Sequence, residues 1–389
     1  MNVFEKDSCY ICSTYGRFPL EIVSGKGSLC YDDNGKEYID MGTGIAVNTF
    51  GFCDDAWMQA VTNQMGKFQH ASNLYYSKPC ADLAELLCAK TGYKKVFFSN
   101  SGAEANECAI KTARKYAEIN KGKKYFNIIT LVNSFHGRTI TTLSATGQEV
   151  FHKDFTPLTE GFIYALANDI QDVKAKVSAN KVCAIMFETV QGEGGVLPLE
   201  KDFVNELVKI ANEKDILLIC DEVQTGNGRC GKLYNYMNYG FMPDIVTTAK
   251  GLAGGIPMGA TLFNDKTKDV LGVGMHGSTF GGNPLASAGA ISIINRLDDT
   301  LMQSVNEKSA FIKQTLEGAK GIKSVTGEGL MLGVEVEGDA KKIVNKCIEK
   351  GVIFLTAKTK VRMLPALNIP MDLLQKALDV LKQVCAEEV

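Results

Sequence analysis

The sequence lacks long hydrophobic runs and an excess of either charge. Its longest apolar runs, such as residues 216–220, are far shorter than the about 20 residues of a membrane-spanning helix. It carries 42 basic and 44 acidic residues among 389, a formal net charge of −2. So balanced a composition gives no electrostatic reason for binding to nucleic acid or to an anionic membrane. We therefore expect neither partner.

The N-terminus lacks the pattern of an export signal, because residues 1–7 contain no basic head followed by an apolar core. Most of the twelve cysteines lie within apolar or helical patterns, as small buried hydrophobic residues do. We therefore expect a cytoplasmic protein with reduced thiols. Cys9 and Cys12 form the one C-x-x-C pair. Without a second pair or a nearby histidine, the sequence favours no metal site and no redox role there.

Strand-like and helix-like patterns alternate through the middle of the chain. The strand-like segments are residues 96–98, 125–130, 183–187, 216–220 and 245–248. Apolar strands separated by helices predict an α/β fold with a mostly parallel central sheet and helices on both faces. We expect residues 46–285 to form this large domain and residues 286–389 a smaller α+β domain. Residues 1–45 are expected to be an N-terminal segment that packs with the smaller domain.

A first candidate site follows the strand-like segment 96–98. Ser101, Gly102 and Ala103 are small residues at the start of a helical pattern. Backbone N–H groups at a helix N-terminus attract anions, and small side chains let an anion approach them. At the carboxyl edge of a parallel sheet this arrangement is typical of a phosphate site. An ordinary helix cap made by Ser101 is the alternative.

Two further strand-like segments end in charged side chains. Asp221 and Glu222 follow residues 216–220, and a carboxylate there can hold a heterocyclic nitrogen in its protonated form. The alternatives are a cap of the next turn and a metal-binding pair of carboxylates, although no histidine cluster lies near in the sequence. Lys250 follows residues 245–248 and precedes a glycine-rich loop. A desolvated lysine has a lowered pKa and can form a Schiff base, although a lysine that extends to solvent fits the same pattern.

A phosphate site, a carboxylate for a ring nitrogen and a Schiff-base lysine are together what pyridoxal phosphate requires of a protein. The order and spacing of these elements resemble the fold-type I pyridoxal-phosphate enzymes, and among them the class III aminotransferases. The resemblance covers essentially the whole chain. It includes Ser134-Phe135-His136-Gly137-Arg138-Thr139, Gln191-Gly192-Glu193-Gly194-Gly195, Asp221-Glu222-Val223-Gln224-Thr225-Gly226 and His276-Gly277-Ser278-Thr279.

The resemblance implies a role for each cofactor residue. Lys250 would bind pyridoxal 5′-phosphate covalently and then move the proton during catalysis. Asp221 would keep the pyridine nitrogen protonated. The other implied cofactor contacts are Ser101, Gly102 and Ala103 at the phosphate, Phe135 on one face of the ring, Val223 and Gln224 near the other face, and Glu222 beside them.

The resemblance also implies the substrate contacts. Arg138 and Arg362 would bind substrate carboxylates, and Glu193 would neutralise Arg362 when the substrate places no carboxylate there. Glu188 would hold Gln224 or Glu193, or else face water. Thr279 would reach the phosphate bound by a partner chain, so a homodimer with shared active sites is implied. The remaining implied substrate contacts are Tyr15, Ile45 and Ser278.

The choice of substrate within the family depends on few residues. The two arginines argue against the aminomutase reaction of some members. Ile45 stands where members that act on free ornithine carry a tyrosine, and an apolar side chain suits an acylated amine better than a charged one. The resemblance therefore implies amino transfer from N-acetylornithine to 2-oxoglutarate, a step of arginine biosynthesis that yields N-acetylglutamate 5-semialdehyde and glutamate.

Other substrates fit the same pattern. N-succinyl-diaminopimelate is a further implied substrate, because it is also an ω-amine that carries an N-acylated amino acid. Transfer from 4-aminobutyrate or from free ornithine remains an alternative. A protein that kept the fold and lost the chemistry is the non-enzyme alternative, which the presence of Lys250, Asp221 and both arginines disfavours.

Overall fold

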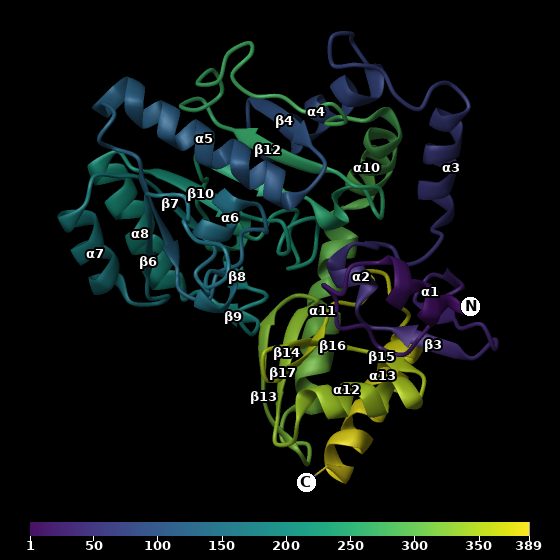
Figure 1. Ribbon diagram of the computed structural model, residues 1–389. Helices are drawn as coiled ribbons and strands as arrows, with labels where there is room; N and C mark the ends of the chain where they lie inside the picture. The colour runs from purple at the N-terminus through teal and green to yellow at the C-terminus, as the bar shows by residue number, and fades with distance from the viewer. Residues whose placement is uncertain (389) are drawn as a thin grey trace.

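The computed structural model describes residues 1–388 and is built around a seven-stranded sheet (Figure 1). All neighbouring strands are parallel except β12, which is antiparallel to both of its neighbours. The strand order is β4 (Lys95–Ser99), β12 (Gly259–Phe263), β11 (Ile245–Thr248), β10 (Leu217–Asp221), β7 (Val182–Phe187), β5 (Asn127–Leu131) and β6 (Phe162–Ala165). The predicted α/β fold with a mostly parallel central sheet is confirmed.

Helices cover both faces of this sheet. Alternate residues of a strand point to opposite faces. Leu217 and Ile219 of β10 pack in one apolar cluster with α5 (Gly102–Lys121), whereas Leu218 and Cys220 pack in another with α8 (Lys201–Lys214). The other helices of this part are α3 (Asp55–Met65), α4 (Lys78–Thr91), α6 (Ile140–Ala145), α7 (Ile170–Ala179), α9 (Tyr236–Tyr239) and α10 (Pro284–Arg296).

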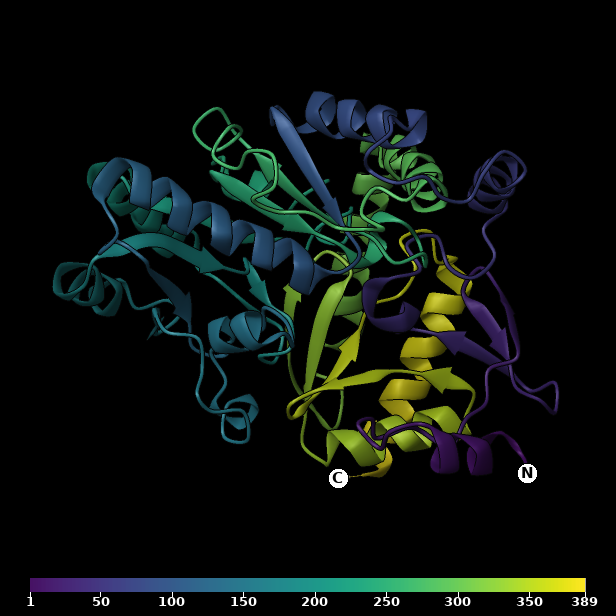
Figure 2. The ribbon, with the colours of Figure 1, turned by 45° about the horizontal axis from the view of Figure 1, so that its top comes forward.

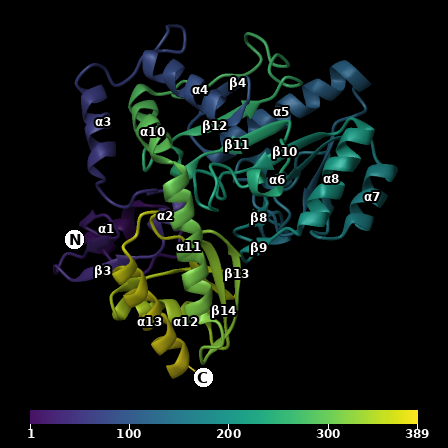
Figure 3. The same cartoon turned by 180° about the vertical axis from the view of Figure 1, so that it is seen from behind.

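A second, antiparallel sheet forms the smaller part of the molecule. Its order is β13 (Ile322–Glu328), β14 (Met331–Val336), β17 (Lys360–Met363) and β16 (Leu355–Ala357). The helices of this part are α11 (Asp299–Leu316), α12 (Ala340–Glu349) and α13 (Met371–Glu387). Seen from behind, α11 follows α10 out of the large part and runs along the small one (Figure 3). None of the helices in residues 1–388 is long and apolar enough to cross a membrane.

The N-terminal segment shares a sheet with the C-terminal part (Figure 2). Strands β1 (Ser24–Lys26), β2 (Leu29–Tyr31) and β3 (Glu37–Asp40) form an antiparallel set, and β3 pairs in parallel with β15 (Val352–Ile353). Short helices α1 (Val3–Tyr10) and α2 (Thr43–Ala46) flank this sheet. The two ends of the chain therefore belong to one structural unit.

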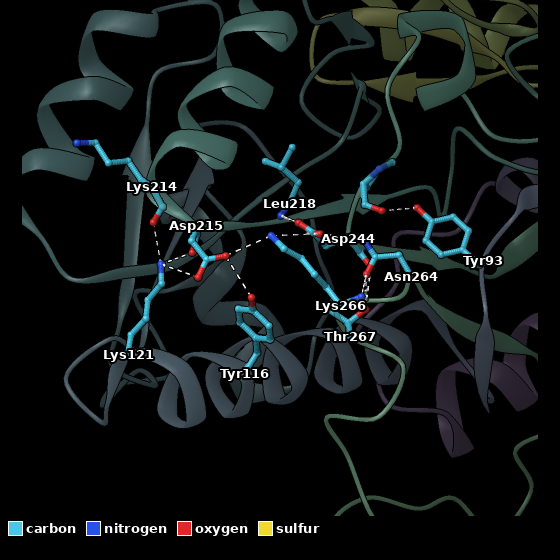
Figure 4. Close-up of polar contacts among 11 residues, drawn as sticks. Tyr93, Tyr116, Lys121, Lys214, Asp215, Leu218, Asp244, Asn264, Lys266 and Thr267 are labelled. Carbon is cyan, nitrogen blue, oxygen red and sulfur yellow. Dashed lines mark hydrogen bonds and ion pairs between the residues drawn. The ribbon is translucent and has the colours of Figure 1, made fainter.

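A polar network fixes the amino-terminal ends of the central strands (Figure 4). Asp244 accepts hydrogen bonds from the Leu218 backbone N–H and from Asn264 Nδ2, both at 2.9 Å. Asp215 accepts from the Tyr116 hydroxyl at 3.1 Å and from Lys266 Nζ at 3.2 Å. These contacts tie α5 and the segment after β12 to the entries of β10 and β11.

A buried arginine joins the large and small parts. Arg229, in the loop that follows β10, is 3% exposed and donates from Nη1 to the carbonyl oxygens of Leu330, at 3.1 Å, and of Pro365. Burial lowers the pKa of Arg229 to about 10. The guanidinium satisfies carbonyl groups that would otherwise be buried without a partner, so it stabilises the contact between the two parts.

We expect Arg229→Met to lower the free energy of unfolding by roughly 2–4 kcal/mol, because two buried carbonyl groups lose their donor. Urea-induced unfolding followed by circular dichroism measures this loss. Arg17→Met is the control, since Arg17 forms an exposed ion pair with Asp7 and such pairs contribute about 1 kcal/mol or less. Equal unfolding midpoints for both variants would contradict the role assigned to Arg229.

Candidate active site

A cavity of about 440 Å³ lies at the carboxyl ends of the central strands. The loops after β4, β5, β7, β10 and β11 surround it, so residues far apart in the sequence meet at one edge of the sheet. Its lining includes many of the residues singled out from the sequence: Ser101, Gly102, Ala103, Phe135, Arg138, Glu188, Asp221, Val223, Gln224 and Lys250.

Lys250 follows β11 by two residues and begins the short helix η2 (Lys250–Leu252) with a φ of 47°. Asn227 fixes the preceding backbone by donating to the Ala249 carbonyl at 3.0 Å. Burial lowers the pKa of the Lys250 amine to about 8, with Glu193 opposing this shift and Arg362 adding to it. An amine with such a pKa is partly unprotonated near neutral pH and can act as a nucleophile or a base.

Asp221, at the end of β10, is 3% exposed and has three hydrogen-bond donors. Asn106 Nδ2 and His136 Nδ1 each lie 2.8 Å from Oδ2, and the Val223 backbone N–H donates to Oδ1 at 3.0 Å. These donors orient the carboxylate toward the cavity that it lines. The opposite ring nitrogen of His136 has no partner in residues 1–388.

Helix α5 starts at the cavity. Ser101 is its N-cap and accepts from the Glu104 backbone N–H at 3.2 Å. The first N–H groups of a helix have no partner within the helix, so those of Gly102 and Ala103 remain available to an anion. An added Cβ on Gly102 would lie 2.7 Å from Val223, so only glycine lets these two loops approach so closely.

Phe135 and Glu188 form another wall of the cavity. The Phe135 backbone N–H donates to Glu188 Oε2 at 2.9 Å, and the ring packs edge-on against Phe151 at 5.8 Å. Glu188 is 5% exposed. Burial, with the nearby charge of Asp221, raises the pKa of Glu188 well above its ordinary value. Arg138 lies over the rings of Phe151 and Phe135 at 4.3 and 5.6 Å.

Arg362 and Glu193 form an ion pair beside the cavity. Arg362, on β17, is 3% exposed and donates from Nη1 to Glu193 Oε1 at 2.5 Å. Although burial acts to raise the pKa of Glu193, the charge of Arg362 and this hydrogen bond lower it overall. Arg362 Nε has no partner in the described part of the chain.

Several predicted residues lie away from this cavity. Glu222 is buried on the other side of the loop, where it accepts from Thr225 Oγ1 at 2.5 Å and from the Tyr236 backbone N–H at 2.7 Å. Burial raises the pKa of Glu222 to about 7. Four further predicted residues do not line the cavity in the single chain: Tyr15, Ile45, Ser278 and Thr279.

Two of the lining residues that the sequence reasoning missed contact Asp221. Asn106 lies one turn after Gly102 on α5, and His136 follows Phe135 directly. Both are buried and both contact Asp221. A polar residue one helical turn after the candidate phosphate site was the available signal for Asn106, because residues i and i+4 share a face of a helix.

The family follows from the whole chain. Residues 10–385 match the model of the family described as Aminotransferase class-III. The chain belongs to the class-III aminotransferases. The fold and family expected from the sequence motifs are confirmed.

Class-III aminotransferases of known name are similar to this chain over nearly its full length. The acetylornithine aminotransferase of Haemophilus ducreyi is 46% identical over 98% of this chain and 98% of its own. The succinylornithine transaminase of Salmonella paratyphi A is 43% identical over 97% of this chain and 94% of its own. The ornithine aminotransferase structure of Toxoplasma gondii, in which PLP partially occupies the active site, has a TM-score of 0.94 and 30% identity over 99% of this chain and 94% of its own.

The lowered pKa of Lys250 predicts its reactivity. Reductive methylation with formaldehyde requires the unprotonated amine, so the rate at Lys250 should rise with pH and level off above about pH 8. Peptide mass spectrometry of samples treated for short times across pH 6–11 measures this rate for each lysine. A profile that still rises near pH 10, as for an ordinary lysine with a pKa of about 10.4, would show that the amine is not desolvated.

Proposed function

We propose that this class-III aminotransferase binds pyridoxal 5′-phosphate and transfers the terminal amino group of N-acetylornithine to 2-oxoglutarate, as a step of arginine biosynthesis. The observation that carries the proposal is that Lys250, Asp221 and the start of α5 line a single cavity. The name of the Haemophilus ducreyi relative supports the choice of donor.

The residues present fit the proposed cofactor. The first N–H groups of α5 offer donors to its phosphate beside Ser101, whose hydroxyl donates to Glu104 Oε2 at 3.1 Å. Asp221 offers a carboxylate to its ring nitrogen. Phe135 and Val223 supply apolar contacts for the ring, and Gln224 supplies a polar group beside them. When bound, pyridoxal phosphate supplies an aldehyde carbon for amines and a ring that accepts electrons from a broken C–H bond.

Lys250 has the properties needed for the proton transfers. Its amine takes a proton from the carbon that carries the donor's amino group, which is Cδ in N-acetylornithine. With glutamate as product, the same amine returns a proton to Cα. Both roles need an amine that is uncharged for part of the time near neutral pH, and a pKa of about 8 provides this.

Two guanidinium groups account for the pair of substrates. 2-Oxoglutarate and glutamate carry two carboxylates, which we assign to Arg138 and Arg362. N-acetylornithine has one carboxylate, which we assign to Arg138, and Glu193 then neutralises Arg362. The 2.5 Å ion pair supports this assignment, because it shows that Glu193 reaches Arg362 without rearrangement. The apolar side chain of Ile45, which is 40% exposed, disfavours a free charged α-amine.

We also propose that the enzyme works as a homodimer with shared active sites. Asn100, which lines the cavity, donates to Ser278 Oγ at 3.1 Å, so the loop that carries Ser278 and Thr279 is anchored beside the start of α5. Thr279 is exposed in the single chain and is assigned to the phosphate bound by the partner subunit. Tyr15, which is 72% exposed, is assigned to the substrate α-carboxylate.

A panel of amino donors tests the choice of substrate. We expect the visible absorbance of the cofactor-loaded protein to fall in a single turnover with N-acetylornithine at least tenfold faster than with ornithine or 4-aminobutyrate, since an unpaired charged amine against an apolar wall costs about 1 kcal/mol or more. A faster response to ornithine would move the assignment to that donor. A protein without visible absorbance after addition of pyridoxal phosphate would contradict the proposal altogether.

Removal of the Glu193 charge tests the assignment of Arg362. We expect Glu193→Gln to slow the single turnover with N-acetylornithine about tenfold, because Arg362 then keeps an unneutralised charge beside a substrate without a second carboxylate. The single turnover with glutamate should stay within about twofold, since its carboxylate replaces Glu193. Glu200→Gln is the control, because Glu200 is exposed at the start of α8. Equal slowing with both donors would show that Glu193 does not discriminate between them.

A further inference from the structure

Three segments that carry site residues meet at Asn133. It lies two residues before Phe135, and its backbone N–H donates to the Gly147 carbonyl at 2.8 Å. Gly194, next to Glu193, approaches it so closely that an added Cβ would lie 2.6 Å from the Asn133 carbonyl oxygen. The third segment comes from the small part of the molecule, where Lys358 Nζ donates to Asn133 Oδ1 at 2.5 Å.

Lys358 lies at the tip of the hairpin that carries Arg362. Ala357 of β16 pairs with Lys360 of β17, which leaves a tight turn of two residues, and Leu355 pairs with Arg362. Such turns require positive φ values. Lys358 has a φ of 53° and Asn133 has a φ of 70°, so both ends of the contact have restricted backbones. Because Arg362 lies in the strand that leaves this turn, a shift of the turn would move Arg362 with it.

We propose that the hydrogen bond from Lys358 to Asn133 positions Arg362 relative to Arg138. It links the hairpin of the small part to the loop of the large part that contains Phe135 and Arg138. It thereby sets the spacing between the two guanidinium groups. This inference rests on the proposed function, because it needs both arginines to bind one substrate. A dicarboxylate that spans both groups depends on this spacing, whereas a substrate with one carboxylate does not.

The ammonium group of Lys358 and the side-chain amide of Asn133 can each be removed by a substitution that leaves the backbone unstrained. Lys358→Met keeps most of the side-chain stem, and Asn133→Gly removes the amide while glycine adopts the positive φ freely. We expect each variant to raise KM for 2-oxoglutarate and the Kd for the probe glutarate about 3- to 10-fold, the range for one lost hydrogen bond. KM for N-acetylornithine and kcat should stay within about twofold of wild type.

Three further variants sharpen the test. The double variant Lys358→Met/Asn133→Gly should be no worse than either single variant, because both remove the same contact. Lys358→Arg should restore part of the glutarate affinity, since arginine also offers a charged donor. Lys323→Met is the matched control, because Lys323 is an exposed lysine on β13 of the same part. Its KM and Kd values should equal those of wild type.

The inference is overturned if glutarate binds Lys358→Met as tightly as wild type, as measured by titration calorimetry. It is also overturned if KM rises equally for both substrates, because that result indicates a general structural role. Failure of wild type to use N-acetylornithine would contradict the proposed function instead. In that case the comparison of glutarate affinities still tests the positioning contact on its own.

Discussion

The desolvation of one amine is the constraint on which the rest of the site depends. Lys250 follows a buried strand at the bottom of a cavity, and the charges around it compensate one another in part. Glu193 attracts the protonated form while Arg362 opposes it. Since these two form an ion pair, their effects on the lysine are linked. A substrate carboxylate that binds Arg362 therefore also changes the electrostatic environment of the amine.

Two neighbouring carboxyl groups at this edge of the sheet have different environments. Asp221 has three hydrogen-bond donors, two of them side chains, which fix its orientation. Glu188 is as deeply buried but has only backbone N–H donors, at 2.9 and 3.4 Å, and its pKa is raised by burial and by Asp221. The cavity thus holds one carboxyl group fixed by side-chain donors and one, Glu188, that favours its neutral form. This difference follows from their partners rather than from their residue type.

The large and small parts contribute different side chains at and beside the cavity. The central sheet supplies Asp221 from the end of β10, where it pairs with Thr247 of β11, and Lys250 from the segment directly after β11. The small part supplies Arg362, which reaches the site through contacts across the junction such as those of Arg229 and Lys358. The position of Arg362 relative to Lys250 and Asp221 therefore depends on how the two parts are joined.

The fold, the family and half of the residues that line the cavity could be predicted from the amino-acid sequence, because alternating patterns and strand-end motifs are local signals. The strands that precede Asp221 and Lys250 and the helix that follows Ser101 lie as predicted. Cytoplasmic location, the domain boundaries and the dimer stay predictions. Three features became evident only from the three-dimensional packing: Asn106 and His136 contact Asp221, Glu222 lies outside the cavity lining, and Lys358 contacts Asn133. These contacts join segments far apart in the chain, so they depend on strand register and packing, which no local pattern encodes.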